Sequence, residues 1–255
     1  MKNFSRTMMV LLFCMGLSFA QNSGCPAFAE GVAAYKSENY VQAISAWETC
    51  VQNGLRNVDV LYNLGNAQYR EGNLGKAIWA YESALRIDPA NPDLNANLEL
   101  ARGQTVDKTE KSEDDNPILK AFWRLHHAMG LNSQLGFLLG FAWFAGLLLI
   151  LAILVRRESA RNAIYVSLFV LGLVASLMGL DAGIKAYLLE TDSSAVVLSK
   201  SADIMSGPGD RYQVLHELHE GTKVQVKEIR EGWANVRIGE SINGFVKIDL
   251  LGLVK

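Results

Sequence analysis

Two long apolar runs near the middle of the chain dominate its pattern of hydrophobic and polar positions. The first covers residues 135–155 without a charged side chain, and the second covers about 163–180. A helix rises about 1.5 Å per residue, so about 20 apolar residues cross the roughly 30 Å hydrocarbon core of a bilayer. The pattern therefore predicts two transmembrane helices, at residues 133–155 and 162–184.

Three arginines, Arg156, Arg157 and Arg161, lie between the two runs. Short loops rich in lysine and arginine stay on the cytoplasmic side of a membrane. We therefore expect residues 156–161 to form a cytoplasmic loop that sets the topology. The parts of the chain before and after the two helices then both lie outside the cytoplasm.

A shorter apolar run follows Lys2 and Arg6 and ends at Ala20. It is too short to span a bilayer, and small residues flank its end as they do at a cleavage site. This pattern predicts a signal peptide at residues 1–20, which exports the N-terminal half in agreement with the arginine loop. An uncleaved signal anchor gives the same topology, and lipid attachment at Cys25 is a further alternative.

Small residues recur four positions apart on both predicted spans, as Gly136 and Gly140 on the first and Gly172 and Ser176 on the second. Small residues at this spacing let helix backbones approach closely in lipid. We expect the two spans to pack as a hairpin. As an alternative, one of the pairs faces a span of a partner protein.

The second apolar run ends at Asp181 and Lys185, which lie one helical turn apart. This spacing predicts an ion pair where the helix leaves the lipid. An ion or proton relay would instead need these charges deeper in the membrane.

Between the signal and the first span, a helical pattern repeats. The segments that begin at Phe28 and Tyr62 align with a shift of 34 positions. Small residues recur where paired helices must approach closely, and large apolar residues recur where they fill the space between the helices. The matched pairs are Gly31 and Gly65, Tyr35 and Tyr69, Ala43 and Ala77, Ile44 and Ile78, and Trp47 and Tyr81. A last helix at residues 92–102 has no partner and is expected to cap this domain, which covers residues 25–102.

The second copy, with "NLGNA", "EGNLGKAI" and "ALRIDPANPD", resembles the tetratricopeptide repeat (TPR). The first copy departs from that family at Glu38 and Leu55, where Gly and Pro are usual. The resemblance implies a concave surface that binds a peptide, lined by Phe28, Val32, Tyr35, Lys36, Tyr62, Asn63, Asn66, Tyr69 and Arg70. The two asparagines can hydrogen-bond an extended backbone, and Arg70 can pair with a carboxylate, although asparagine is also common in the repeat consensus.

Residues 103–117 mix both charges with almost no apolar side chains, which predicts a flexible linker. Residues 118–132 follow as an interfacial helix, because Ile118, Phe122, Leu125 and Met129 share one helical face. His126 and His127 are adjacent and point in different directions on a helix. We interpret them as interface residues and not as metal ligands.

Past the second span, residues 195–255 alternate short strand patterns with turn residues such as "SGPGD", "EGT" and "REG". The order of these elements resembles the bacterial SH3 domain, which implies a small barrel. The sequence departs from that family at Met205 and Phe245, where Arg and Trp are frequent. His216 and His219 are three positions apart, on opposite faces of a strand, and do not form a zinc-protease motif.

Three cysteines are present, and Cys14 falls within the predicted signal peptide. Cys25 and Cys50 remain as an even pair in an oxidising compartment, which favours one disulfide. In the repeat alignment, the start of one helix and the end of its antiparallel partner bring the two together. Two free thiols are the alternative.

Composition narrows the class of function. The formal net charge of -2 provides no basic field of the kind that nucleic-acid binders use. The sequence also contains no triad spacing, Gly-rich phosphate loop or cluster of metal ligands. We therefore expect a protein that is not an enzyme, does not bind nucleic acid and needs no cofactor or metal.

The order of parts, an exported TPR domain, two spans and an exported SH3-like domain, resembles the BatE type of the Bat (aerotolerance) group. The predicted fold class is a multi-domain membrane protein with an all-α TPR solenoid, a two-helix transmembrane hairpin and a small all-β bacterial SH3-like barrel. The resemblance implies a bacterial inner-membrane protein with both terminal domains in the periplasm. It also implies membrane partners that carry von Willebrand A domains, and a role in aerotolerance or envelope stress.

Two classes of function follow from these parts, and a third, an enzyme or transporter, is disfavoured because the sequence contains no catalytic motif and no charged pair deep in the spans. A scaffold or adaptor binds protein partners through the TPR groove and the SH3-like module. A cell-wall sensor or tether instead binds peptidoglycan through the SH3-like domain. The first is favoured because a TPR array is a peptide-binding surface, while the identity of the peptide is not encoded in any motif.

Overall fold

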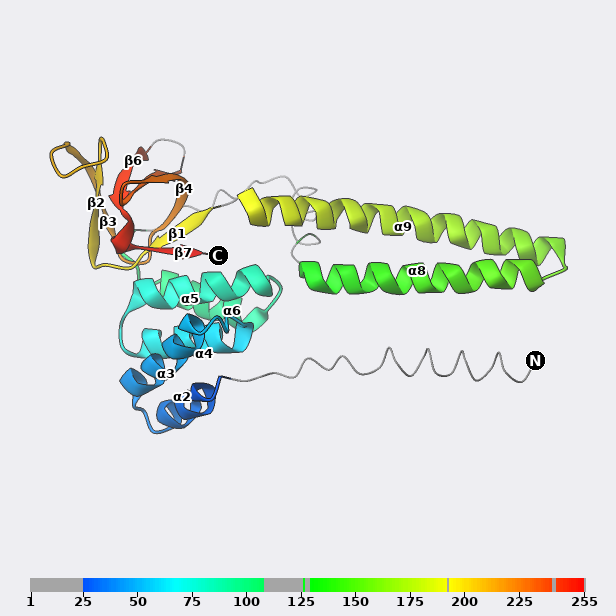
Figure 1. Cartoon of the computed structure of the whole chain (residues 1–255), viewed down its shortest axis with the longest axis horizontal. Coiled ribbons are helices and arrows are strands. Elements are labelled where there is room, and N and C mark those ends of the chain that lie inside the picture. Colours follow the sequence, from blue (N-terminus) through cyan, green and yellow to red (C-terminus); the bar gives the residue numbers. More distant parts are fainter. Residues whose placement is uncertain (1–24, 108–125, 127–128, 192, 240–241, 255) are drawn as a thin grey trace.

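The computed structural model describes residues 25–107, 126, 129–191, 193–239 and 242–254 (Figure 1). A helical region, two long apolar helices and an antiparallel β-sheet follow one another along the chain, in the predicted order. The predicted signal peptide (1–20) lies outside the described residues. So does the predicted interfacial helix (118–132), apart from His126 and the residues from Met129 onward.

The described part of the helical region consists of α2 (Ala27–Lys36), α3 (Tyr40–Gln52), α4 (Val58–Arg70), α5 (Leu74–Ile87) and α6 (Pro92–Arg102). Asn39, Asn57 and Asn91 precede three of these helices, and each side chain accepts a hydrogen bond from the backbone N–H three positions later. Such N-caps satisfy donors that a helix leaves unpaired at its start. The local sequence therefore fixes where these helices begin.

Equivalent glycines let the two helices of each repeat meet. A Cβ added to Gly31 would lie 2.5 Å from Trp47 Nε1, and one added to Gly65 would lie 2.5 Å from Tyr81 Cε1. No larger residue fits at either position without displacing a buried aromatic ring. The alignment of Gly31 with Gly65 thus reflects one packing contact made twice.

A disulfide joins Cys25 to Cys50, with the Cα atoms 5.5 Å apart. Cys25 precedes α2, and Cys50 lies near the end of α3. Because the two helices are antiparallel, these positions meet at one end of the first repeat.

The two long helices, α8 (Leu131–Leu154) and α9 (Glu158–Thr191), pack side by side (Figure 1). Both contain segments that are long and apolar enough to cross a membrane. Residues 155–157 connect them, so the prediction that Arg161 belongs to the connecting loop is wrong: Arg161 lies within α9. Glu158 occupies the first turn of α9, where the positive end of the helix dipole stabilises an acidic side chain.

The hairpin forms through a different set of residues from the predicted one. The less exposed side chains recur every three or four residues on both helices, which is the spacing of a coiled coil. They include Gln134, Leu138, Phe141, Ala145, Leu148 and Ala152 on α8, and Ile164, Leu168, Leu171, Ala175, Met178 and Ala182 on α9. A Cβ added to Gly136, Gly140 or Gly172 would meet nothing within 4 Å, and Ser176 is exposed. These small residues therefore lie outside the contact between the helices.

The predicted ion pair between Asp181 and Lys185 is present, with a separation of 2.8 Å. It belongs to a larger cluster, because the Asp181 carboxylate also contacts His126 and accepts a hydrogen bond from Gln134. Lys185 Nζ donates to the carbonyl of Met129 at 3.0 Å. The cluster holds the segment that precedes α8 against the side of α9.

The C-terminal domain is an antiparallel sheet with the strand order β3-β2-β6-β5-β4-β1-β7. The strands are β1 (Ser194–Val197), β2 (Ser201–Met205), β3 (Val214–His219), β4 (Lys223–Arg230), β5 (Trp233–Ile238), β6 (Ile242–Lys247) and β7 (Leu251–Val254), with a 3-10 helix, η1 (Ile248–Leu250), before β7. Every strand contributes to one buried aliphatic core. Met205 and Phe245, the two departures from the bacterial SH3 pattern, are paired across β2 and β6.

The sheet packs directly on α5 (Figure 1). Val196 of β1 and Val254 of β7 are buried in the same cluster as side chains of α4, α5 and α6. Trp79 Nε1 on α5 donates a hydrogen bond to the carbonyl of Leu253 at 2.9 Å. The helical region and the sheet therefore share a hydrophobic core, an arrangement that the periodic patterns of the sequence do not predict.

Charged contacts extend this interface between the helices and the sheet. Glu82 is only 6% exposed and pairs with both Arg102 of α6 and Lys223 of β4. The flexible linker predicted from residue 103 is wrong for residues 103–107, because side chains in this segment bind the sheet. The rest of the predicted linker, 108–117, lies outside the described residues.

Candidate functional site

A hollow with a volume of about 410 Å³ opens between α2, α4, α5 and α6, and we call it the groove. It is lined by Tyr35, Asn66, Tyr69, Arg70, Tyr81, Asn97 and Leu100. Tyrosine rings, amide groups and a guanidinium dominate this lining, and none of these seven residues is acidic. The groove therefore offers hydrogen-bond donors and aromatic faces beside the positive charge of Arg70.

Helix α4 supplies the polar floor of the groove. Asn66, Tyr69 and Arg70 are three or four positions apart, so they share one face of the helix. The Asn66 side-chain oxygen accepts hydrogen bonds from the Tyr81 hydroxyl at 2.8 Å and from Asn97 Nδ2 at 2.9 Å. Because these two donors take up the oxygen, the Asn66 amide nitrogen is the group that can donate to a ligand.

The protonation states of Arg70 and Tyr81 suit the binding of a ligand that accepts hydrogen bonds. A hydrogen bond with Tyr35 raises the pKa of the Arg70 guanidinium above its ordinary value, so its charge is permanent. Burial raises the pKa of the Tyr81 hydroxyl, which therefore stays protonated and keeps donating to Asn66. The groove thus keeps its cation and its donors across the physiological pH range.

The two ends of the groove differ in character. Leu100, on α6, is 56% exposed and forms an apolar wall. Tyr69 accepts a hydrogen bond from the side chain of Gln104, which follows α6. On the opposite side the Tyr35 ring packs edge-on against Tyr40, with centroids 5.2 Å apart. An extended segment of polypeptide would find apolar, aromatic and polar contacts in succession.

Of the residues predicted from sequence, the groove brings together Tyr35, Asn66, Tyr69 and Arg70. The others lie elsewhere, in ways that the repeat pattern alone does not show. Phe28, Val32 and Tyr62 pack against the buried cores, and the Phe28 carbonyl accepts a hydrogen bond from Trp47. Asn63 Nδ2 donates to the Asp59 carbonyl of its own helix, and Lys36 is exposed at the end of α2. Peptide binding by the residues in the groove stays a prediction.

Tyr81, Asn97 and Leu100 line the groove but were not among the predicted residues. In the repeat alignment Tyr81 matches the buried Trp47, which suggests packing and gives no sign that its hydroxyl reaches Asn66. Asn97 and Leu100 belong to α6, for which the sequence predicts only a capping role. Leu100, the large apolar side chain that α6 leaves exposed, is a signal that could have indicated a binding role.

Comparison with known protein families supports the identity of the helical region. The tetratricopeptide repeat family model matches residues 28–92. The match begins in α2 and ends at the first residue of α6, so it covers both repeats and the helices that carry most of the groove. No curated protein matches the chain. The N-terminal part of the protein is therefore a TPR region, a type of module that mediates protein–protein binding.

Proposed function

We propose that this protein is a membrane-anchored adaptor that binds a protein partner through the groove of its TPR region. The observation that carries this proposal is the lining of the groove, which combines Arg70 and the Asn66 amide with tyrosine rings and contains no acidic residue. Such a surface suits an extended peptide with a carboxylate, because the cation pairs with the charge and the amide donates to a peptide carbonyl. In this proposal the protein acts by binding and has no catalytic role.

An extracytoplasmic position for the groove is supported by two features. The Cys25–Cys50 disulfide joins two positions within the TPR region, and disulfides persist mainly in oxidising compartments. Helices α8 and α9 are long and apolar enough to anchor the chain, and Arg156 and Arg157 lie at their connection, as in a cytoplasmic loop. We infer a bacterial inner-membrane protein whose TPR region and sheet both lie in the periplasm.

The partner is proposed from the order of the parts. A TPR region, two apolar helices and a sheet domain resemble the BatE type of the Bat group, whose partners are membrane proteins with von Willebrand A domains. We infer a role as a scaffold in a complex of this kind, linked to aerotolerance or envelope stress. The resemblance of the sheet to bacterial SH3 domains supports a second contact through that domain.

A capture experiment with matched charge variants tests the adaptor function. The full chain, Arg70→Gln and Lys36→Gln are each purified from detergent-solubilised membranes, and the proteins that accompany them are quantified by mass spectrometry. Arg70 lines the groove, whereas Lys36 is an exposed cation that does not. Loss of a charge-assisted hydrogen bond weakens binding by about ten-fold, so a partner of the groove should be depleted from Arg70→Gln alone.

Equal recovery of every partner from both variants would contradict binding through the groove. Recovery of a protein with a von Willebrand A domain, lost with Arg70→Gln, would support the proposed complex. Binding of the full chain to isolated sacculi, unchanged in both variants, would favour the cell-wall tether instead.

A further inference from the structure

Residues 103–107 leave the end of α6 and contact both the groove and the sheet, and we call this segment the strap. Gln104 and Thr105 continue the helix end with turn-like backbone hydrogen bonds to Ala101 and Arg102. The strap is short, so its contact with the groove and its contact with the sheet lie only a few residues apart along the chain. It therefore makes one polar contact with the groove and another with the β3–β4 turn of the sheet.

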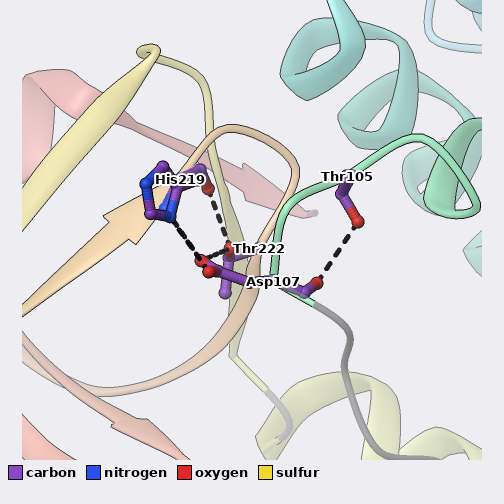
Figure 2. A network of polar contacts seen from close by, with 4 residues as sticks. All are labelled: Thr105, Asp107, His219 and Thr222. Carbon is purple, nitrogen blue, oxygen red and sulfur yellow. Dashed lines mark hydrogen bonds and ion pairs between the residues drawn. The ribbon is translucent and has the colours of Figure 1, made fainter.

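At the sheet end, Asp107 is fixed by several donors (Figure 2). One carboxylate oxygen accepts hydrogen bonds from the His219 backbone N–H at 2.8 Å and from the Thr222 hydroxyl at 2.6 Å. The other oxygen lies 3.0 Å from His219 Nδ1. Burial opposes the charge on this carboxyl, but the hydrogen bonds from Thr222 and His219 outweigh it and lower the pKa of Asp107 below its ordinary value. Asp107 is therefore an ionised anchor for the turn between β3 and β4.

In the middle of the strap, Thr105 packs against the β3–β4 turn, beside Ile78 of α5. Gly221, in the β3–β4 turn, has a φ of 86°, and an added Cβ there would lie 2.6 Å from Thr105 Cγ2 and 2.7 Å from Ile78 Cδ1. The Thr105 hydroxyl donates to the Arg102 carbonyl at 2.8 Å, which sets the direction in which the strap leaves α6. Only glycine permits this approach, so the strap, α5 and the turn fit together in one arrangement.

At the groove end, Gln104 Nε2 donates to the Tyr69 hydroxyl. Tyr69 lines the groove, and Gln104 itself is exposed, so a ligand can reach this hydrogen bond. Gln104 and Asp107 are three residues apart. Release of the first changes the freedom of the chain that positions the second.

We propose that the strap couples occupancy of the groove to the docking of the sheet on α5. This inference rests on the proposed function, since it assigns a consequence to the binding of a peptide. A ligand that hydrogen-bonds to Tyr69 competes with Gln104, detaches the groove end of the strap and weakens the hold of Asp107 on the β3–β4 turn. By thermodynamic linkage, a sheet that is less firmly docked leaves Tyr69 more available to the ligand.

The position of the strap in the chain relates this coupling to the two long helices. The strap precedes α8 in sequence, and α9 leads into β1, the strand that packs on α5. A change in docking therefore alters how the TPR region is held relative to the helical hairpin. The strap is a device that reports groove occupancy toward the membrane.

The test needs no ligand, because removal of the Tyr69 hydroxyl imitates the loss of its contact with Gln104. Amide hydrogen exchange is followed by mass spectrometry on the full chain in detergent, in peptides that cover residues 216–223. Tyr69→Phe and Gln104→Ala should each raise the exchange rate of these peptides by about five-fold, the lower range of measured couplings between sites. The double variant should add little, since both changes break one hydrogen bond.

Two controls make the result decisive. Asp107→Ala removes the sheet anchor itself and should raise exchange in the same peptides at least as much. Tyr62→Phe removes a tyrosine hydroxyl from the same helix outside the groove and should leave them unchanged. If Asp107→Ala accelerates exchange while Tyr69→Phe or Gln104→Ala does not, the coupling is refuted, and peptide binding in the groove can still stand on the capture experiment.

Discussion

The two helical repeats follow one alignment but are stabilised on their outer sides in different ways. In the first repeat, Val41 is 66% exposed and Ser45 is also exposed on α3. The equivalent positions of the second repeat hold Gly75, which is buried, and Trp79, which bonds to the sheet. Helix α5 is consequently buried along most of its length, whereas α3 buries mainly one face.

The difference shows that a repeat period reports only the contacts that every repeat must make. The inner contacts of Gly31 with Trp47 and of Gly65 with Tyr81 are the same. The outer faces reflect the particular neighbours of each repeat: solvent in the first, and a β-sheet in the second. The first repeat is instead closed by a disulfide between the buried Cys50 of α3 and Cys25, which precedes α2. If this division is correct, changes to the disulfide and to the sheet contact should affect different repeats.

Removal of the disulfide should produce the largest effect on the first repeat. A cross-link between positions 25 residues apart restricts the unfolded chain and contributes about 3 kcal/mol to the free energy of unfolding. We expect Cys25→Ala/Cys50→Ala to lose about this amount in urea denaturation, while hydrogen exchange in β1 and β7 stays unchanged. Mass spectrometry of the unreduced protein that finds both thiols free would refute the bridge itself.

Substitution of Gly75 should affect the second repeat. Gly75→Val installs the residue that the first repeat carries at this position, but its Cβ would lie less than 3.0 Å from the backbone oxygen of Val197. Overpacking against a backbone atom should destabilise the docked sheet by about 2 kcal/mol and accelerate exchange in β1 and β7. The control, Val41→Ala, changes an exposed site and should cost less than about 0.5 kcal/mol. Similar losses in the two variants would contradict the comparison.

The parts of the fold that the sequence predicts are those encoded by local periodicity. The glycine and aromatic positions of the repeats, the charge-free run of α8 and the alternating strands each repeat within a few residues. Docking of the sheet is different, because Trp79 and Leu253 lie 174 positions apart and Asp107 and His219 lie 112 apart. No short period links such pairs, although a tryptophan in place of Ser45 on an outer helix face indicates that something covers it.

The candidate site was predicted in part for the same reason. Tyr35, Asn66, Tyr69 and Arg70 occupy positions that the repeat consensus places on the inner helices, so the resemblance locates them. Phe28 and Tyr35 both pack against Trp47, with ring centroids 6.5 Å and 6.0 Å apart, yet only Tyr35 lines the groove. The consensus gives the face of a helix but not which side chains on that face border the hollow, because the hollow is also shaped by Tyr81 of α5 and by Asn97 and Leu100 of α6.

Acidification should weaken the sheet contact with little effect on the first repeat. The lowered pKa of Asp107 means that its charged form stabilises the docked state at every pH above the ordinary value of about 3.9. That contribution is lost only as the pH falls through the lower value of the docked state. In urea denaturation, the free energy of unfolding of the docked sheet should therefore stay constant between pH 7 and 5 and decline below about pH 4. Asp107→Asn should dock less firmly at neutral pH and decline less in acid; an identical acid decline in both proteins would exclude Asp107 as the cause.

The smallest expected effect comes from the turn between the helices of each repeat. Glu38 has a φ of 61°, and Gly72 has a φ of 77° at the equivalent position. The left-handed conformation costs a residue with a side chain about 1 kcal/mol, which a change to glycine removes. Glycine also raises the entropy of the unfolded chain, which offsets part of that gain in stability. We expect Glu38→Gly to stabilise the first repeat by about 0.5 kcal/mol and Gly72→Glu to destabilise the second by a similar amount, both measured by urea denaturation with the disulfide intact. A loss of stability in Glu38→Gly would mean that the Glu38 carboxylate stabilises the first repeat through its charge, for example through its interaction with Arg70.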